Sequence, residues 1–195
     1  MGLIIIGVAG ALVLLFFLIT LIWWIGAYNM LNRLKFRAEN AWSQIDVQLK
    51  RRHDLIPNLV EAVKAFAKHE RETLEAVIKA RNTAIDPNLK ASEKVAAEGE
   101  LSGALSRLMM TVEQYPELKA NENFLNFQEE LTSTENKLSF ARQAYNDAVM
   151  VYNMKIKSMP ANIVANISSF NTMEMFELAE PEAREVPKVD FNSDS

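Results

Sequence analysis

The N-terminal stretch without charged residues constrains the fold of this chain more than any other feature. The first 32 residues contain no aspartate, glutamate, lysine or arginine, and all 21 basic and 25 acidic side chains lie from Arg33 onward. Residues 3–27 are uninterruptedly apolar or weakly polar. As a helix they would extend ~37 Å, more than the ~30 Å that a hydrocarbon layer requires. We therefore predict a single transmembrane anchor over residues 1–29.

A cleaved signal peptide is the competing interpretation of this segment. Signal peptides begin with basic residues and have an apolar core of ~7–15 residues. Here the start is uncharged and the apolar run is longer. The pattern favours an anchor that stays in the membrane.

Aromatic and basic residues at the end of the anchor indicate one membrane surface and an orientation. Amphipathic aromatic rings collect at the headgroup level, and lysine and arginine collect on the cytoplasmic side. We therefore expect the N-terminus outside and the rest of the chain in the cytoplasm. The predicted membrane-interface residues are Trp23, Trp24, Tyr28, Arg33, Lys35 and Arg37.

Composition excludes several functional classes. The chain has no cysteine, so disulfides, thiolate metal sites and a cysteine nucleophile are absent. Residues 33–173 are nearly neutral and the segment from Glu174 onward is acidic, so no basic face for nucleic acid is expected. The two histidines, His53 and His69, do not form a zinc motif, because Thr73 stands where a second ligand is required. We expect no metal, no cofactor and no enzymatic activity.

The body of the chain is predicted to be all-α. Between residues 32 and 159 there are three prolines and two glycines, and strand-like alternation is absent. Apolar stripes predict helices over about 30–85, 92–114 and 122–158, the last with a coiled-coil-like heptad seam. Such helices bury their stripes most simply in an antiparallel bundle, over residues 30–159, that follows the transmembrane helix.

Two positions in the apolar stripe that predicts the helix over about 30–85 are unfavourable for a regular apolar helix. Arg52 occupies a stripe position where an apolar residue is expected. Pro57 cannot donate the backbone hydrogen bond to the carbonyl of His53, so it either kinks the helix or ends it. The stripe keeps its phase across Pro57, which favours a kinked continuous helix.

The chain changes in composition after Pro160. Residues 160–176 are predicted to form a short helix that folds back on the bundle, or a segment that docks on a partner or a membrane surface. Residues 177–195 are acidic and are predicted to be a disordered tail. The candidate partner-contact residues are Ile163, Val164, Ile167, Phe170 and Phe176.

Several motifs in the body resemble those of the LemA family. They are the segment 41–60 (AWSQIDVQLKRRHDLIPNLV), the segment 115–121 (YPELKAN), the segment 131–136 (LTSTEN), and the pairs Ala141-Arg142, Tyr145-Asn146 and Tyr152-Asn153. The resemblance covers roughly residues 28–191. It implies a bacterial inner-membrane protein with one span and a helical-bundle domain, and no established biochemical activity. One relative is associated with building the magnetosome membrane, which suggests membrane organisation.

Polar residues of these motifs lie beside the apolar seams. Polar groups that lose contact with water must be paired, so we expect a buried or half-buried network that fixes helix register. A binding groove is the alternative use, and helix capping or simple solvation is the third. The candidate residues are Gln44, Asp46, Asn58, Glu135, Asn136, Arg142, Asn146 and Asn153.

The leading functional hypothesis is a membrane-anchored, non-enzymatic helical scaffold or membrane-organising protein that self-associates as a homo-oligomer. The alternative is an adaptor or signalling module that regulates a membrane protease or an envelope-stress response. A scaffold forms large discrete assemblies in detergent, whereas an adaptor stays small and co-purifies with one membrane enzyme.

Overall fold

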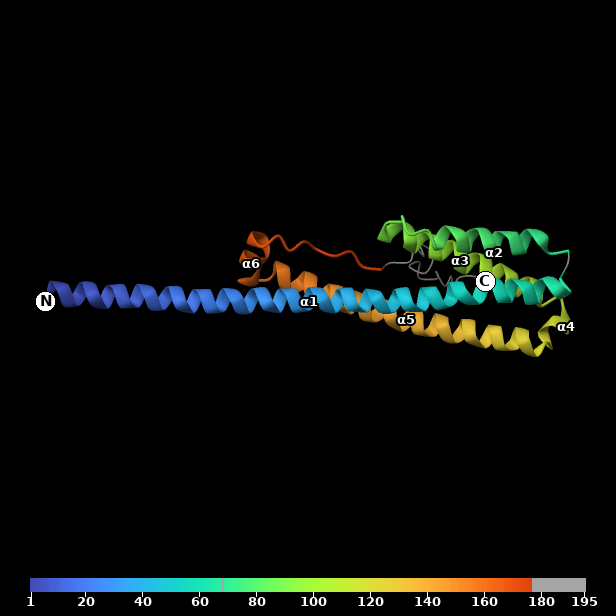
Figure 1. Cartoon of the computed structure of the whole chain (residues 1–195), viewed down its shortest axis with the longest axis horizontal. Helices are drawn as coiled ribbons and strands as arrows, with labels where there is room; N and C mark the ends of the chain where they lie inside the picture. Colours follow the sequence, from blue (N-terminus) through green and yellow to red (C-terminus); the bar gives the residue numbers. More distant parts are fainter. Residues whose placement is uncertain (68, 177–195) are drawn as a thin grey trace, which may run out of the picture. The chain divides into compact units, whose positions relative to one another are not determined.

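The computed structural model describes residues 1–67 and 69–176, and within these ranges it contains helices and no strand (Figure 1). The all-α fold class, with a long apolar N-terminal helix and a helical region after it, is confirmed. The predicted acidic tail, 177–195, lies outside the described residues. The helices are α1 (Gly2–Phe66), α2 (Arg71–Ala84), α3 (Ala91–Val112), α4 (Pro116–Lys119), α5 (Glu122–Lys157) and α6 (Ala161–Ile167).

Helix α1 contains the predicted anchor and continues beyond it without a break. It runs from Gly2 to Phe66, so the expected boundary between residues 29 and 30 is a change of composition and not the end of a helix. In the described chain, α1 is the one helix long and apolar enough to cross a membrane, and none of the side chains in its most apolar window is buried within the protein. Side chains of this kind require lipid or another apolar partner.

The prediction of one helix over about 30–85 is wrong. Helix α1 passes through Pro57 but ends at Phe66, and the chain reverses before α2 begins at Arg71. No proline or glycine marks this reversal. Its physical reason is tertiary packing: the turn lets α2 bury Leu74 and Val77 against the core, where a straight continuation would leave them in water.

The described chain forms two compact units, and α1 and α5 contribute to both. The first unit comprises residues 1–50 and 134–175, and the second begins at Arg51 and extends to Ser133, with Phe176 added. The sequence had predicted a single bundle over residues 30–159.

The second unit is a four-helix arrangement with an up-down-up-down course. It contains the last part of α1, then α2, α3 and the first part of α5. His53 of α1 lies beside Glu98 of α3. Glu70, which follows the end of α1, lies beside Tyr115, which follows the end of α3, so α3 runs parallel to α1. Helices α2 and α5 run the opposite way. The apolar faces of the four helices, together with α4, form one core whose largest fully buried members include Ile56, Leu59, Leu101, Leu108, Leu118 and Phe124.

The link between α3 and α5 contains the short helix α4, which follows Pro116. The side-chain oxygen of Asn121 accepts a hydrogen bond from the backbone N–H of Phe124 at 3.1 Å. This is the N-cap contact of α5, because the first N–H groups of a helix have no partner within it.

The first unit is an antiparallel pair of helices, α1 and α5, with α6 folded onto it (Figure 1). The ring centroids of Trp42 and Tyr145 lie 5.1 Å apart in an edge-on contact. Nearer the anchor, Leu31 packs with Tyr152. These contacts pair rising residue numbers in α1 with falling numbers in α5, as an antiparallel coiled-coil-like pair requires.

Candidate functional site

A buried charge cluster, which we define as Arg52, His53, Glu98 and Ser102, joins α1 to α3 in the second unit. The carboxylate of Glu98 is fully buried, and its Oε1 lies 2.7 Å from Nε2 of His53. Its Oε2 lies 3.5 Å from Nη1 of Arg52, itself almost completely buried. Nη2 of Arg52 donates to Oγ of Ser102 at 2.8 Å. Each charge in the cluster thus faces a group of opposite charge or a hydrogen-bonding partner, as burial requires.

Helix α2 completes this region through the backbone of His53. Because Pro57 has no N–H, the carbonyl of His53 lacks its partner within α1. Nε of Arg81, from α2, donates to that carbonyl at 2.8 Å. The proline is therefore accommodated inside α1 because a side chain from a neighbouring helix replaces the missing donor. This contact explains why α1 continues through Pro57 where a helix end was the alternative.

The cluster links the two helices through hydrogen bonds and ion pairs. The hydroxyl of Ser102 donates to the backbone carbonyl of Glu98 at 3.0 Å and accepts from Arg52. The arrangement of the cluster fixes the register of α1 against α3.

Sequence reasoning missed Glu98, His53 and Arg81 as members of this network. The available signal was Arg52 in an apolar stripe, which implies a buried acidic partner. Glu98 precedes Leu105 of the stripe over 92–114 by seven residues and so lies on the same helix face. Together these two positions could have suggested the pair.

The structure divides the polar residues that sequence reasoning selected between half-buried and exposed positions. Arg142 and Glu135 form an ion pair along α5 at 3.6 Å. Asp46, Asn146 and Asn153 are half-buried in the first unit, where α1 and α5 pair. The remaining three residues are exposed, and these are Gln44, Asn58 and Asn136.

Asn153 has a defined role, which is to hold a C-terminal strap. We use this name for residues 168–175, which follow α6 without helical structure and lie along α5 in the first unit. The side-chain amide of Asn153 donates to the carbonyl of Met173 at 2.8 Å, and its oxygen accepts from the N–H of Met173 at 3.0 Å. The asparagine thereby satisfies both backbone groups of one strap residue.

Two tyrosines, one heptad apart on α5, hold the strap at two further places. The hydroxyl of Tyr145 donates to the carbonyl of Glu174 at 2.8 Å, and the hydroxyl of Tyr152 donates to the carbonyl of Asn171 at 2.9 Å. Burial raises the pKa of the Tyr145 phenol above its ordinary value, and the negative charge of Glu174 raises this pKa further. Burial likewise raises the pKa of Tyr152, with a smaller effect from Glu39. Both phenols therefore stay protonated and act as donors at neutral pH.

The candidate partner-contact residues divide into buried and exposed members. Val164 is fully buried against α1, and Phe176 is 4% exposed, so neither presents its side chain to a partner. Phe170 is half-buried and makes an edge-on contact with Tyr28, with ring centroids 5.5 Å apart. Ile163 and Ile167 are exposed.

The predicted membrane-interface residues all lie on α1, where they are either exposed or partly covered by α6. Trp23 and Tyr28 are exposed, and Trp24 is half-buried beside the apolar cluster that contains Val164. Arg33, Lys35 and Arg37 are exposed on the next turns of α1.

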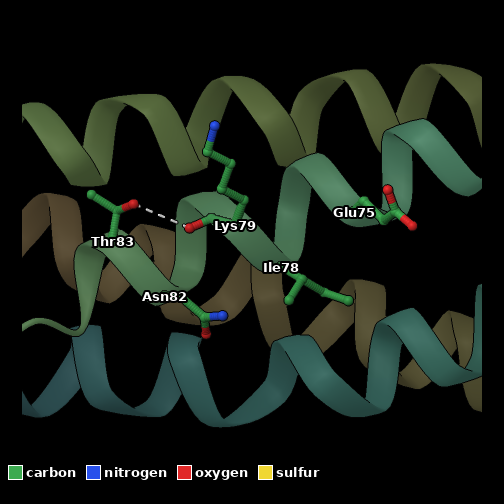
Figure 2. A pocket seen from close by; sticks show the side chains of 5 residues that line it. All are labelled: Glu75, Ile78, Lys79, Asn82 and Thr83. Atoms are coloured by element: carbon green, nitrogen blue, oxygen red, sulfur yellow. Dashed lines mark hydrogen bonds between the residues drawn. The ribbon is translucent and has the colours of Figure 1, made fainter.

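A shallow surface depression of about 480 Å³ lies along α2 (Figure 2). Glu75, Ile78, Lys79, Asn82 and Thr83 line it, and all five come from this one helix. Figure 2 shows the side chains of Lys79 and Asn82 pointing in opposite directions, and the hydroxyl of Thr83 donates to the backbone carbonyl of Lys79 at 3.2 Å. Titratable groups do not converge here as they do in an active site.

These observations define the class of the protein, which is a membrane-associated all-α protein. They are the apolar N-terminal part of α1, the helical body and the structural use of the polar residues. The sequence matches the model of the LemA family over residues 41–191. The chain belongs to the LemA family, and the resemblance noted from its motifs is confirmed.

Relatives of this chain include a LemA protein and magnetosome proteins. The chain is 25% identical to Protein LemA of Metamycoplasma hominis over 191 residues, which is 96% of this chain and 85% of the relative. It is 34% identical to Magnetosome protein MamQ 2 of Paramagnetospirillum magneticum over 83 residues, which is 43% of this chain and 30% of the relative. With Magnetosome protein MamQ of Magnetospirillum gryphiswaldense it shares 25% identity, over 76% of this chain and 64% of the relative. The chain thus spans less than two thirds of the magnetosome proteins.

Proposed function

We propose that this protein is a membrane-anchored, non-enzymatic helical scaffold that organises the bacterial inner membrane and self-associates. In this proposal residues 3–27 of α1 cross the bilayer, the N-terminus lies outside and the helical body lies in the cytoplasm, because Arg33, Lys35 and Arg37 flank the inner end. The relatives named as magnetosome proteins agree with the membrane organisation that the family resemblance implies, and this supports such a role here.

The observation that carries the proposal is the use of polar side chains within the fold. Arg52, Arg81 and Asn153 all bind groups of this same chain, either buried side chains or backbone atoms. Such contacts determine shape and register and leave these side chains unavailable for a substrate. A scaffold requires a defined shape more than it requires reactive groups.

Self-association is supported by apolar side chains that the first unit leaves exposed on the outer faces of its helix pair. Phe36 and Val47 of α1 are 56% and 57% exposed, and Phe140 and Met154 of α5 are 72% and 59% exposed. A second copy of the chain would cover these side chains with similar helical surfaces. Covering an exposed phenylalanine or methionine is worth about 1.5–3 kcal/mol per side chain.

Mass measurement of the full chain in mild detergent tests the proposal. We expect discrete assemblies of several copies, and we expect the double variant Phe140→Ser/Met154→Ser to give smaller ones. Gln143→Ser is the matched control, since Gln143 is an exposed polar residue of the same helix, and it should leave the assemblies unchanged.

Two results would contradict the scaffold proposal. One is a wild-type chain that remains monomeric at all concentrations. The other is a monomer that co-purifies in fixed ratio with one membrane protease or signalling enzyme, which supports the adaptor alternative instead.

A further inference from the structure

We propose that α6 is a membrane-surface element that rests in the headgroup layer of the bilayer crossed by α1. The proposal rests on the transmembrane placement of residues 3–27 given above, and it assigns to lipid a helix face that the protein itself leaves uncovered. The contacts that support it all lie within the first unit.

The inner face of α6 fixes its position along α1. Val164 and Ala165 are buried together with Ala27 and Leu31 of α1 and with Tyr152 and Ile156 of α5. Ala27 is the last residue of the apolar run, and Leu31 lies one turn farther on. Trp24 packs against the same cluster. Helix α6 is therefore attached at the point where the predicted span ends.

The depth of this point follows from helix geometry. If Trp23 and Trp24 lie at the membrane interface, Ala27 is ~5 Å beyond them and Leu31 is ~11 Å beyond them, at ~1.5 Å per residue. The headgroup region on each side of the hydrocarbon layer is ~5–7 Å thick. A helix that contacts both residues thus lies within or directly beside the headgroups.

The outer face of α6 has the character of a surface-bound helix. Ile163 and Ile167 are four residues apart, so they share one face, and they are 46% and 67% exposed. Met159, which precedes the helix, is 77% exposed. Interfacial helices place such side chains at the boundary between headgroups and acyl chains.

Basic residues around α6 favour a lipid surface over a second protein. Arg33 and Arg37 of α1 are exposed, and Lys155 and Lys157 lie in the last turn of α5, just before α6. Anionic headgroups attract bases near a membrane surface. An apolar face that continues from the anchor and is bordered by bases matches an anionic bilayer.

Site-specific fluorescence in vesicles tests this assignment, and the absence of cysteine makes single labelling direct. The full chain is reconstituted in phosphatidylcholine and phosphatidylglycerol vesicles as Ile163→Cys or Ile167→Cys, each labelled with a polarity-sensitive dye. Gln143→Cys is the matched control, because Gln143 is an exposed residue of the same unit, outside the proposed self-association residues, and its place on α5 is ~21 Å from the end of that helix. Phe17→Cys reports on the span itself. Circular dichroism confirms that each variant is folded.

Lipids that carry a nitroxide near the headgroup should quench the labels at Ile163 and Ile167 at least about twofold more than the label at Gln143. If the label at Phe17 is quenched by deep nitroxides while those at Ile163 and Ile167 behave like the control, the assignment of α6 is overturned and the anchor stands. The same conclusion follows if the α6 labels are shielded from aqueous iodide but not quenched by lipid, because a protein surface then covers them. If the label at Phe17 is not quenched, the anchor and the proposed function fail as well.

Discussion

The contact between Arg81 and the carbonyl of His53 makes a quantitative prediction about how α1 tolerates Pro57. Arg81→Met removes the donor and keeps an apolar stem of similar length. A lost hydrogen bond to a charged donor costs ~1.5–3 kcal/mol, and a partner left without a bond adds to this when it is buried. Because Arg81 is only half-buried, water can partly replace it, and we expect a loss of about 1–2 kcal/mol.

The size of this loss should depend on residue 57. In the variant Pro57→Ala the new backbone N–H can bond to the carbonyl of His53, as in a regular helix. Arg81→Met should then cost less than about 0.5 kcal/mol. The four proteins of this double-mutant cycle should give a coupling free energy of about 1 kcal/mol or more.

Amide hydrogen exchange of the full chain in detergent micelles is the appropriate assay, because a chain with two units need not unfold in one step. The readout is the opening free energy of peptides from α2 and from residues 51–66 of α1. Lys79→Met is the matched control, since it removes an exposed cation from the same helix. If the effects of Pro57→Ala and Arg81→Met are additive, Arg81 does not replace the missing donor and the reasoning is refuted.

Three further predictions follow from the charge cluster and the strap. Glu98→Gln leaves Arg52 and His53 facing a neutral side chain, so the unfolding free energy of the second unit should fall by about 3 kcal/mol. The exposed control Glu100→Gln should change this free energy by less than about 0.5 kcal/mol. Equal effects of the two substitutions would contradict the role of the cluster. Asn153→Ala should increase amide exchange of residues 168–175 by about tenfold, corresponding to about 1.4 kcal/mol, while the exposed control Asn136→Ala leaves it unchanged. The raised pKa values of Tyr145 and Tyr152 mean that their contribution to stability is complete below the unfolded-state pKa of ~10 and is lost as pH rises through the higher folded-state values. An absorbance titration of phenolate should therefore show midpoints above ~10 that fall in denaturant, and unchanged midpoints would exclude the burial effect.

Hydrophobic periodicity was sufficient to predict the helical class and the long helix that became α5, because both depend on local spacing. The heptad seam through Tyr145 and Tyr152 marks the face that α5 buries. The anchor was equally visible, since an uncharged apolar segment of more than ~18 residues is typical of a transmembrane helix.

The reversal between Phe66 and Arg71 could not be predicted from local signals. It contains no proline or glycine, and the sequence on either side favours helix. The turn exists because Leu74 and Val77 bury themselves by folding back, which is a property of the assembled core. Local propensity gives no information on this gain.

The contacts of the strap were hidden for a different reason. Asn153 and both tyrosines were identified as motif residues, but their partners are backbone groups of residues 171–174. Every residue has such groups, so no side-chain pattern marks the acceptor. The partner of Arg81 was hidden in the same way, because the absence of an N–H at Pro57 becomes informative only when α2 is placed beside α1.

These contacts also indicate where a functional surface should be sought. Apolar seams with a heptad repeat can shift by one repeat at modest cost, but a buried Glu98 must meet Arg52 and His53 in one register, because any other leaves a charge without a partner. Arg52, Glu98 and Asn153 are thus used within the chain, and substituting them should alter shape before it alters binding. Exposed apolar side chains, such as Phe140 on α5 and Ile163 and Ile167 on α6, remain available for other contacts. Contacts with a second copy or with lipid should therefore depend on these residues, and variants there should change assembly or membrane contact while leaving the helical content intact.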